Sequence, residues 1–467
     1  MEGGRQHYNI TLAVLVLAGT AFAFQQTMVF PALSTFQREL GGTTAWVTWV
    51  LTAFLIAAAV TTPVLGKLGD QFGKERMLLV SLAIFLAGCI GAALAWNLWS
   101  LIAFRGLSGA GGALFPLSFA IIRDEFPPER VPVGIGLMSA VFGVGGGVGI
   151  VLSGVIVDHL SWRLLFVLGS IPVALSILLV HKYVPESPIR TPSRIDVPGA
   201  VLLSAALVAF MLGLTEGENW GWTSPAVLGL GLTAAALFLL WGAVELRSSA
   251  PMVDIGMLAH RPVLLTNITT LISGFALFSC FVLVPTFVSA PENRGYGFGA
   301  SATLAGVFLL PSSIAMLFSG PLSGVLGKRV GQKWTLAGGM TIVAFAAFLL
   351  AFAHDERSTV LLASAGLGIG VGAAFASMVS LIAENVDARE MGVATGVNTV
   401  VRLVGSVVGA QLGAVLLTAL TIDGTSAPAE SAFTWAFAVS AVAALVAAAI
   451  ALSIGRRRVP HRVLAEA

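Results

Sequence analysis

Two arginines, Arg105 and Arg402, stand deep inside long apolar stretches of this 467-residue sequence. A charged side chain at bilayer depth costs about 2.5–3.5 kcal/mol on insertion scales, and it usually faces a cavity or a partner. Asn398 precedes Arg402 by one helical turn, so both side chains share a helix face. Gln25 lies about 12 Å below the end of its own stretch and Arg105 about 9 Å, at 1.5 Å per residue. These polar residues are the candidates for lining a cavity or for coupling helix movements.

The other reactive residue types form no catalytic or metal-binding constellation. The six histidines fall in loops or near the ends of apolar stretches, and no G-x-x-x-x-G-K-[ST] phosphate loop occurs. Cys89 and Cys280 lie in apolar stretches without a CxxC pattern or a neighbouring histidine, which indicates core packing. The sequence therefore predicts no metal, no cofactor and no enzymatic activity.

The elements that position these residues must be membrane helices. Apolar residues make up 57% of the chain and charged residues 10%, with a mean hydropathy of +0.93. Ordinary soluble domains have about 45–50% apolar and about 25% charged residues. This composition excludes a water-soluble protein and predicts an all-α, polytopic membrane protein in a lipid bilayer. The net charge of +2 carries no basic excess, which excludes nucleic acid as a partner.

A spanning helix needs about 20 mostly apolar residues, because lipid offers no partner for backbone polar groups. Fourteen stretches meet this requirement. They cover residues 11–33, 46–66, 77–95, 99–122, 134–157, 162–181, 198–215, 225–245, 263–288, 302–323, 333–353, 358–382, 391–418 and 432–454.

The basic residues predict the orientation of the spans. An even number of spans places both termini on one side, and the positive-inside rule selects that side. With cytoplasmic termini, 19 of the 25 Lys and Arg residues fall in cytoplasmic segments, four fall outside and two lie within spans. We therefore predict a multi-pass protein of the cell (plasma or inner) membrane with both termini in the cytoplasm.

A short pattern occurs twice. The second span is followed by Gly66-Lys-Leu-Gly-Asp70-Gln-Phe-Gly73, and the tenth by Gly324-Val-Leu-Gly-Lys328-Arg-Val-Gly331, an offset of 258 residues or eight helices. Directly duplicated six-helix halves would give an offset of six helices. We therefore predict two six-helix bundles, residues 1–181 and 263–467, and two inserted helices with flanking cytoplasmic loops in residues 182–262. Parallel repeats are typical of transporters, although short glycine-rich loops also occur in other membrane proteins.

The first copy resembles the cytoplasmic motif G-x-L-x-D-x-x-G-[RK]-[RK] of the major facilitator superfamily, at Gly66, Asp70, Gly73, Lys74 and Arg76. The resemblance implies that Asp70 is a conformational latch. Its carboxylate is expected to interact with basic residues or helix ends on the cytoplasmic face and to stabilise the outward-open state.

Two further segments resemble the fourteen-helix drug/proton antiporter branch of that superfamily (QacA/EmrB-like). The fourth span carries Arg105-Gly-Leu-Ser-Gly, similar to R-x-x-Q-G-x-G. The fifth carries Gly145, Gly149 and Gly154, similar to the antiporter motif G-x-x-x-G-P-x-x-G-G, and Ser-Trp-Arg follows at residues 161–163. The resemblance covers nearly the whole chain.

Three positions depart from the branch. Ile150 replaces the proline of the antiporter motif, Ser170 replaces a common Asn, and Phe24-Gln25-Gln26-Thr27 stands where an L-D-x-T pattern carries an Asp. One hypothesis is that the Gln25 carbonyl accepts a hydrogen bond from the Arg105 guanidinium in place of that carboxylate. The alternative is that Arg105 satisfies helix backbone carbonyls and only holds the bundle together.

Acidic residues are absent from the predicted middle of the membrane, since all 23 lie in loops or near span ends. Proton coupling needs a group that gains and loses a proton between two access states, and an arginine does not deprotonate. Asp158, His159, Glu216 and Glu218 near the outer face could serve, and the alternative is that they are solvated loop residues.

The resemblance implies a secondary active transporter, namely a proton-coupled exporter of hydrophobic or amphipathic drugs that works by alternating access and supports antibiotic resistance. Its expected partners are such a small molecule, protons and lipid. A lipid or natural-product exporter or an uncoupled facilitator is the alternative, and a membrane transferase lacks a site. Aromatic and methionine side chains are expected to give an adaptable apolar cavity: Phe54, Phe115, Met138, Phe142, Phe275, Phe278 and Met316.

Overall fold

The computed structural model describes residues 8–187, 196–248, 251–422, 425 and 427–455. These residues form an all-α fold, and β pairing among them is limited to an isolated bridge between Thr421 and Pro428. Fourteen helical segments of the described chain are long and apolar enough to cross a membrane, which confirms the predicted number.

The helices fall into three consecutive parts of the sequence. The first part contains α1 (Tyr8–Thr27), α2 (Val29–Leu40), α3 (Thr44–Phe72), α4 (Lys74–Ala93), α5 (Leu98–Ser108), η1 (Gly109–Ala113), α6 (Leu114–Glu125), α7 (Val131–His159) and α8 (Arg163–Tyr183). The second contains α9 (Val197–Trp220), α10 (Pro225–Glu245) and α11 (Ile255–Ala259). The third contains α12 (Arg261–Ser289), η2 (Glu292–Arg294), α13 (Ala302–Val330), α14 (Gln332–Phe352), α15 (Arg357–Asn385), η3 (Ala388–Glu390), α16 (Met391–Ala419) and α17 (Glu430–Leu452).

The repeated pattern lies mostly within helices and not in loops, which corrects the predicted span ends at residues 66 and 323. α3 continues through Gly66 and Asp70 to Phe72, and α13 continues to Val330. Each helix ends where a glycine adopts a positive φ, +119° at Gly73 and +99° at Gly331, a region that other residues rarely adopt. Gly66 and Gly324, which come before these positions, lie within the helices and pack closely against other helices.

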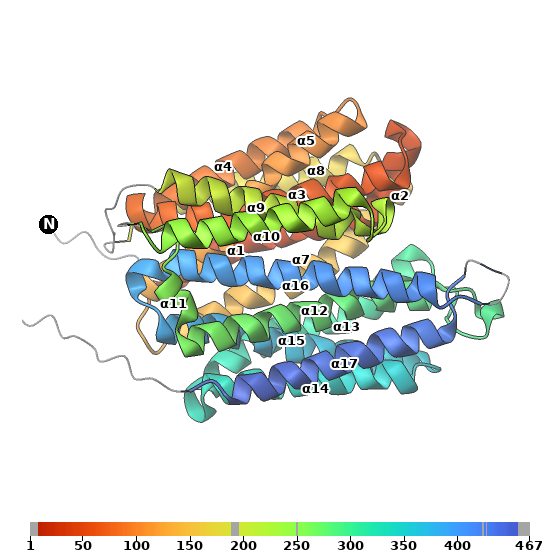
Figure 1. Ribbon diagram of the computed structural model, residues 1–467. Coiled ribbons are helices and arrows are strands. Elements are labelled where there is room, and N and C mark those ends of the chain that lie inside the picture. Colours follow the sequence, from red (N-terminus) through yellow and green to blue (C-terminus); the bar gives the residue numbers. More distant parts are fainter. Residues whose placement is uncertain (1–7, 188–195, 249–250, 423–424, 426, 456–467) are drawn as a thin grey trace, which may run out of the picture.

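The helices run roughly parallel to one axis, with the start of α1 and the end of α17 at the same end of the molecule (Figure 1). We call this end, which contains Tyr8 and Leu452, the terminal end. The opposite end, which contains the connection between α16 and α17, is the far end. The Thr421–Pro428 bridge lies in that connection.

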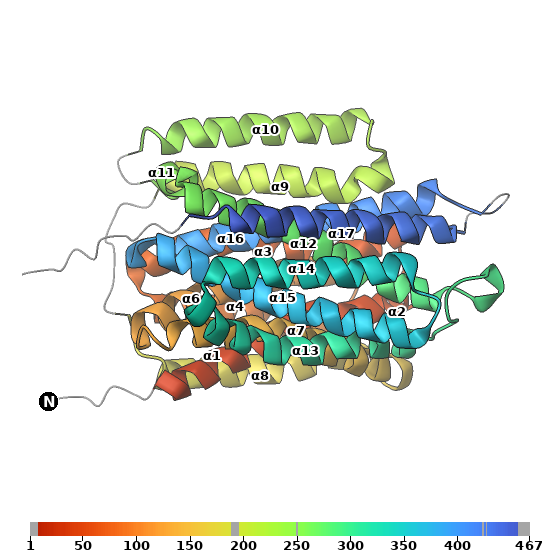
Figure 2. The same cartoon turned by 90° about the horizontal axis from the view of Figure 1, so that it is seen from below.

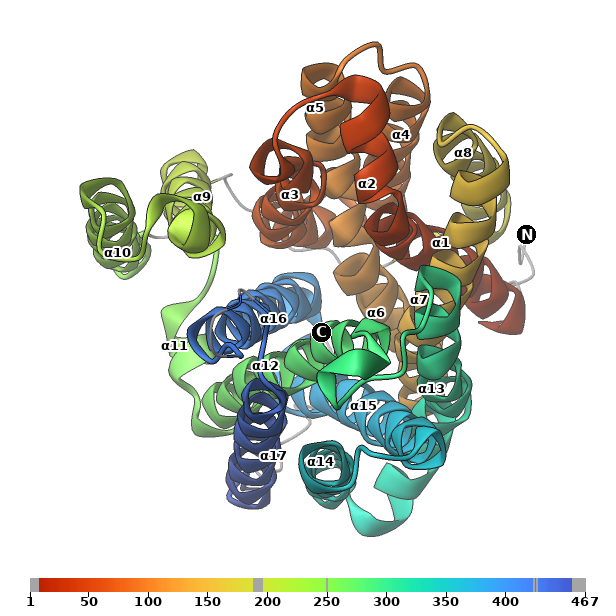
Figure 3. The same cartoon turned by 90° about the vertical axis from the view of Figure 1, so that its right-hand side faces the viewer.

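Viewed along this axis, the helices gather in two groups (Figure 3). The N-terminal group is formed by α1 to α8 and the C-terminal group by α12 to α17, and each has one hydrophobic cluster whose buried residues are all its own. α9 contacts both α3 and α16, so it borders the two groups on one side. Figure 2 shows α10 as the outermost helix, with α9 between it and the rest of the molecule. The interface between the groups is therefore the place where a functional site can be shared.

Candidate functional site

A cavity of about 940 Å³ lies between the two groups of helices. α1, α3, α7, α12, α13, α15 and α16 supply most of its wall, and Met211 and Thr215 of α9 add to it. Along the described chain the lining contains no carboxylate, and its charged member is Arg294, which is exposed near the far end. An apolar cavity with a few neutral polar groups is suited to a small hydrophobic or amphipathic molecule.

The predicted aromatic and methionine residues contribute to this wall in part. Phe54, Phe142, Phe278 and Met316 line the cavity. Phe115 stacks on the ring of Phe142 with their centroids 4.2 Å apart, so it supports the lining from behind. Met138 and Phe275, which were also predicted, are not lining residues of the cavity. Sequence analysis missed Phe281 and Phe433, which line the cavity and carry no signal that separates them from packing phenylalanines.

The terminal end of the cavity is closed by a contact between α3 and the start of α16. The Asp70 carboxylate accepts hydrogen bonds from the backbone N–H groups of Gly392 (3.3 Å) and Val393 (3.1 Å). These N–H groups belong to the first turn of α16, which has no intrahelical partner for them and carries the positive end of the helix dipole. Asp70 thus joins the two groups by binding a helix end, which is one of the two kinds of partner expected for it.

Lys74 ties the Asp70 contact to α6. Its Nζ lies 3.9 Å from an Asp70 carboxylate oxygen and donates a short hydrogen bond to Asp124, and all three side chains are buried. The adjacent Arg123 crosses to the C-terminal group, where it donates to the Val386 carbonyl at 2.6 Å. Sequence analysis missed Arg123 and Asp124. The available signal was a charged pair at the end of the fourth predicted span, on the same side as Asp70.

Glycines allow the groups to touch at the terminal end. A Cβ on Gly66 would lie 2.7 Å from the Gly392 carbonyl oxygen, and one on Gly136 of α7 would overlap the Gly320 carbonyl of α13. Since Cβ atoms do not approach backbone so closely, these contacts exist only because glycine occupies the positions. The closed terminal end is therefore built from backbone-to-backbone packing together with the Asp70 contact.

The remaining motif residues support the start of α4. Glu186 accepts hydrogen bonds from the backbone N–H groups of Glu75 (3.2 Å) and Arg76 (3.4 Å). The Glu186 carboxylate occupies the space that a side chain at Gly73 would need. The side chain of Arg76 is exposed and lies 3.9 Å from Glu186. Glu186 was not predicted, and its acidic type just after the sixth span was the signal for it.

The second copy of the motif packs in a corresponding place without an acidic latch. A Cβ on Gly324 would overlap the Pro132 carbonyl, so α13 meets the start of α7 as closely as α3 meets α16. However, Lys328 stands where the first copy has Asp70, and its side chain is exposed. Within the described chain, the second copy of the motif therefore lacks the acidic contact that Asp70 makes between α3 and α16.

Arg105 and Gln25 meet, but not through the Gln25 side chain. The Arg105 guanidinium donates to the main-chain carbonyls of Val50 (3.3 Å) and Gln25 (3.4 Å) and lies 4.2 Å from the centroid of the Phe54 ring. The Gln25 amide instead donates to the Phe166 carbonyl at 3.5 Å, and its Oε1 has no hydrogen-bond partner within the described chain. The hypothesis of a side-chain replacement for the branch carboxylate is therefore wrong, and Arg105 satisfies backbone carbonyls as the alternative stated.

We expect Arg105→Lys to retain at least a third of transport activity and Arg105→Ala to lose most of it. A lysine keeps the charge beside Phe54 and can donate to one of the two carbonyls, whereas alanine leaves both carbonyls and the cavity wall unsupported. Transport should be measured per folded molecule, with the melting temperature of each purified variant recorded alongside. Equal transport by the lysine and alanine variants would contradict a role for the charge.

Arg402 and Asn398 share one face of α16 but have different surroundings. Asn398 is buried, and its amide donates to the Asn267 side chain (2.8 Å) and the Thr270 hydroxyl (2.9 Å), both on α12. It joins two helices of one group and is not among the residues recorded in the cavity lining. The Arg402 guanidinium lies against the rings of Phe142 (4.7 Å) and Phe375 (4.4 Å), which both line the cavity.

The glycines of α7 face two different neighbours. Cβ atoms on Gly145 and Gly149 would overlap Ala23 and Thr27 of α1, and the Thr27 hydroxyl donates to the Gly145 carbonyl at 3.1 Å. Gly143 and Gly147 face α13 of the other group with similar closeness. Gly154 differs, because its nearest neighbour would be the Thr303 hydroxyl at an ordinary 3.5 Å. Two of the three predicted motif glycines are therefore required by packing within the N-terminal group.

Asp158, His159 and Glu216, three of the predicted proton-exchanging residues, are not lining residues of the cavity. Asp158 and His159 are exposed at the far end of α7. Glu216 is buried and accepts a hydrogen bond from Asn219 at 3.2 Å. The Glu218 side chain falls outside the described residues.

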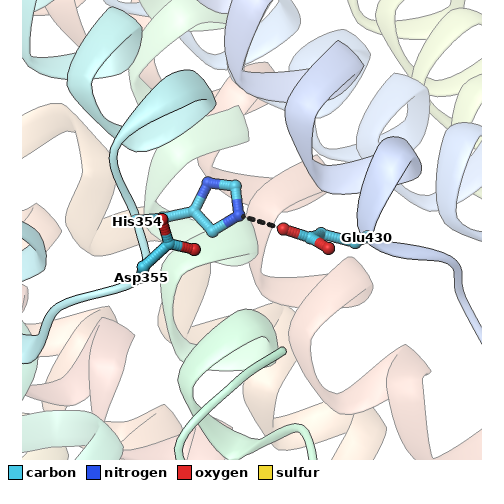
Figure 4. Close-up of side chains that lie close together, drawn as sticks. All are labelled: His354, Asp355 and Glu430. Atoms are coloured by element: carbon cyan, nitrogen blue, oxygen red, sulfur yellow. Dashed lines mark hydrogen bonds and ion pairs between the residues drawn. The ribbon is translucent and has the colours of Figure 1, made fainter. Parts of the chain in front are cut away.

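A separate cluster of His354, Asp355 and Glu430 lies at the far end (Figure 4). His354 Nδ1 is 2.8 Å from the Leu350 carbonyl, and Nε2 is 2.9 Å from a Glu430 carboxylate oxygen. Because the Leu350 carbonyl can only accept a hydrogen bond, Nδ1 donates to it, and Nε2 pairs with the Glu430 carboxylate. The contact joins the α14–α15 connection to the start of α17, within the C-terminal group.

Comparison with known proteins places these features in context. The family model described as Major Facilitator Superfamily matches residues 15–322 and 268–467. Multidrug resistance protein 3 of Bacillus subtilis (strain 168) is 28% identical over 393 residues, 82% of this chain and 74% of that protein. The Tetracenomycin C resistance and export protein of Streptomyces glaucescens is 28% identical over 392 residues, 83% of this chain and 72% of that protein.

Two further proteins are similar to this chain over different shares of their own length. An uncharacterized MFS-type transporter of Mycobacterium tuberculosis (strain ATCC 25618 / H37Rv) is 32% identical over 396 residues, 83% of this chain but 56% of that protein. The crystal structure of the human organic anion transporter MFSD10 (TETRAN) superposes with a TM-score of 0.68 at 14% identity. The superposition covers 95% of this chain and 99% of that chain, which shows a shared fold.

Proposed function

This chain belongs to the Major Facilitator Superfamily and is a membrane transporter of its drug-efflux branch, and from that premise we propose that it exports small hydrophobic or amphipathic molecules by alternating access. The observation that carries the proposal is the apolar cavity between two groups of helices, which contact each other at the terminal end through Asp70 and the glycines of α3, α7, α13 and α16. To change the side from which such a cavity is reached, the contact at the terminal end must open and the far end must close.

We propose that the moving units are residues 1–181 and 263–467, with residues 182–262 as an inserted pair of helices. Two hydrophobic clusters support this division, because the buried residues of one all lie within 276–454 and those of the other all lie within 28–166. Met211 and Thr215 support a role for α9 as part of the cavity wall beside α3 and α16. α10 carries many exposed apolar side chains, among them Leu232 and Leu239, which suits contact with lipid.

We place both termini in the cytoplasm and the protein in the plasma or inner membrane, because the basic residues concentrate on the terminal side. With this orientation the terminal end is cytoplasmic and the far end faces outward. The present conformation is then outward-facing, which agrees with export as the direction in which substrate is released.

The proposed coupling ion is the proton, following the resemblance to drug/proton antiporters. Asp70 makes the closing contact and Asp124 is paired with the adjacent Lys74, so these two carboxylates are our candidates for the group that exchanges protons. The absence of a carboxylate from the described cavity lining favours a second candidate function, an uncoupled facilitator or an exporter of natural products or lipids. A relative that is named for tetracenomycin C export supports natural products within that alternative.

Reconstitution into liposomes tests transport and coupling separately. A neutral and a cationic dye are followed in parallel, with imposed pH or voltage gradients and with empty liposomes as control. We expect dye movement that requires the protein and rises at least threefold with a pH gradient. Protein-dependent dye movement at a rate that neither gradient changes would establish the uncoupled facilitator. Dye movement no faster than in empty liposomes would overturn the transport proposal.

A further inference from the structure

Arg402 is a charged residue that the fold leaves without a polar partner. It lies in α16 about 16 Å from the start of that helix at 1.5 Å per residue, far from either membrane surface. Within the part of the chain that the structure describes, no hydrogen bond or ion pair is made by its guanidinium. The residue is half-buried rather than fully enclosed, and although it is not itself a lining residue of the cavity, it contacts two residues that are.

The surroundings of Arg402 place its charge beside the cavity. The rings of Phe142 and Phe375 lie 4.7 Å and 4.4 Å from the guanidinium carbon, and both rings belong to the cavity wall. Leu403 and Ser406, on the same helix, also line the cavity. Two aromatic faces hold the cation in place, yet they satisfy none of its five N–H donors.

Arg105 provides a contrast on the N-terminal side. Its guanidinium donates to two backbone carbonyls and is fully buried. Its Nη2 has no hydrogen-bond partner within the described chain, but the side chain is fully enclosed, so a ligand cannot reach it. Arg402 has the same charge and a similar aromatic neighbourhood, but it is half-buried and contacts two rings of the cavity wall, and this difference singles it out.

We propose that Arg402 binds the anionic group of an amphipathic substrate whose apolar body occupies the cavity, and this inference rests on the export function proposed above. A carboxylate, sulfonate or phosphate offers the acceptors that a guanidinium pairs with in a bidentate manner. The apolar body then contacts the rings and the methionine of the wall, including Phe278, Phe281 and Met316.

The charge distribution of the cavity supports an anion over a cation. The described lining holds no carboxylate that could neutralise a cationic substrate, and Arg294 near the far end has the same sign as Arg402. Low-dielectric walls strengthen the positive field of these two arginines, which therefore disfavours an organic cation in the cavity. Neutral compounds lack this repulsion and bind through the apolar wall alone.

Three fluorescent probes that share the apolar dansyl body and carry different charges test the inference. Dansylglycine is an anion, dansyl-ethylenediamine is a cation and dansylamide is neutral. Their binding to the purified full-length protein in phosphatidylcholine nanodiscs is measured after subtraction of binding to empty nanodiscs. We expect dansylglycine to bind at least tenfold more tightly than the cation. Equal affinities, or a preference for the cation, would overturn the proposal.

Substitutions then assign the preference to Arg402. Arg402→Gln should weaken dansylglycine binding at least tenfold and change dansylamide binding less than threefold. Arg357→Gln, a matched change at an exposed residue of the far end, should leave all affinities unchanged. If Arg402→Gln loses the neutral probe as well, Arg402→Lys decides, because it must keep the preference for the anion. Unaltered dansylglycine binding in Arg402→Gln, or loss of the preference in Arg402→Lys, would refute the assignment.

Two sources of the anionic group are distinguished by lipid composition. If the natural ligand is an anionic lipid, phosphatidylglycerol in the nanodisc should compete and weaken dansylglycine binding at least threefold in the unsubstituted protein but not in Arg402→Gln. If it is a water-soluble amphipathic anion, phosphatidylglycerol should have no effect. Transport of a neutral dye without any anion preference would refute this inference while the export function stands, and the absence of any dye transport would remove the export function itself.

Discussion

Replacing Asp70 by alanine should open the terminal end of the molecule and reduce transport at least tenfold. Asp70 makes two charge-assisted hydrogen bonds to the first turn of α16, a helix that begins 321 residues later in the chain. Hydrogen bonds to charged groups each contribute about 1.5–3 kcal/mol when both partners are present. Losing both, with partial replacement by water, shifts the equilibrium between closed and open terminal ends by about 2–4 kcal/mol, or roughly 30-fold to 1,000-fold.

A neutral side chain at position 70 is expected to replace the contact with the backbone N–H groups of α16 only in part. Asp70→Asn retains one acceptor oxygen but loses the charge that the helix dipole favours, so we expect an effect between those of aspartate and alanine. The buried Lys74 adds to the cost, because it keeps Asp124 but loses the second carboxylate at 3.9 Å. A buried cation that loses part of its compensation further destabilises the closed state.

Distances between spin labels measure this shift directly. Glu129 and Lys328 are exposed at the terminal end, one in each group of helices, and each can be replaced by a labelled cysteine in a protein whose two native cysteines are alanine. Asp70→Ala should increase the population with the longer distance. Glu75→Gln, at the start of the next helix α4, serves as a control that leaves the Asp70 contact intact. Unchanged distances and unchanged transport in Asp70→Ala would show that Asp70 is not the latch.

The second large effect is expected for Gly145→Ala in α7, which should separate α7 from α1 and destabilise the N-terminal group. The added Cβ would overlap the Ala23 Cβ and lie 2.9 Å from the Phe24 nitrogen, and neither backbone nor alanine can rotate away. Overpacking of this kind costs about 1–3 kcal/mol, and it also moves the Phe24–Thr27 segment that borders the cavity. We expect a lower melting temperature and at least a fivefold loss of transport.

Gly154→Ala is the matched control, because it makes the same change nine residues later on the same helix. There the new Cβ meets the Thr303 hydroxyl at 3.5 Å, an ordinary contact. Alanine also has a better helix propensity than glycine by about 1 kcal/mol, so this variant should be as stable as the natural chain or more so. If both variants behave alike, close approach of α1 and α7 is not the reason for the glycines.

The sequence by itself determined the number of spans and the all-α fold. Both depend on a local requirement, since in lipid each helix must satisfy its own backbone and expose about 20 apolar residues. The motif around Asp70 was likewise recognisable, because it consists of neighbouring residues and a glycine turn at Gly73. The ends of the spans were less certain, since glycines at Gly66 and Gly324 suggested a loop where close packing keeps a helix.

Only the tertiary structure decided which polar residues face the cavity. Asn398 and Arg402 share a helix face, yet one is hydrogen-bonded to α12 and the other lies between two cavity rings. In the same way, Arg105 meets the main chain of Gln25 and not its amide group. These outcomes depend on how each helix is rotated and shifted against neighbours that lie far away in the sequence. Local hydropathy does not encode that rotation, because lipid and a packed helix accept the same apolar side chains.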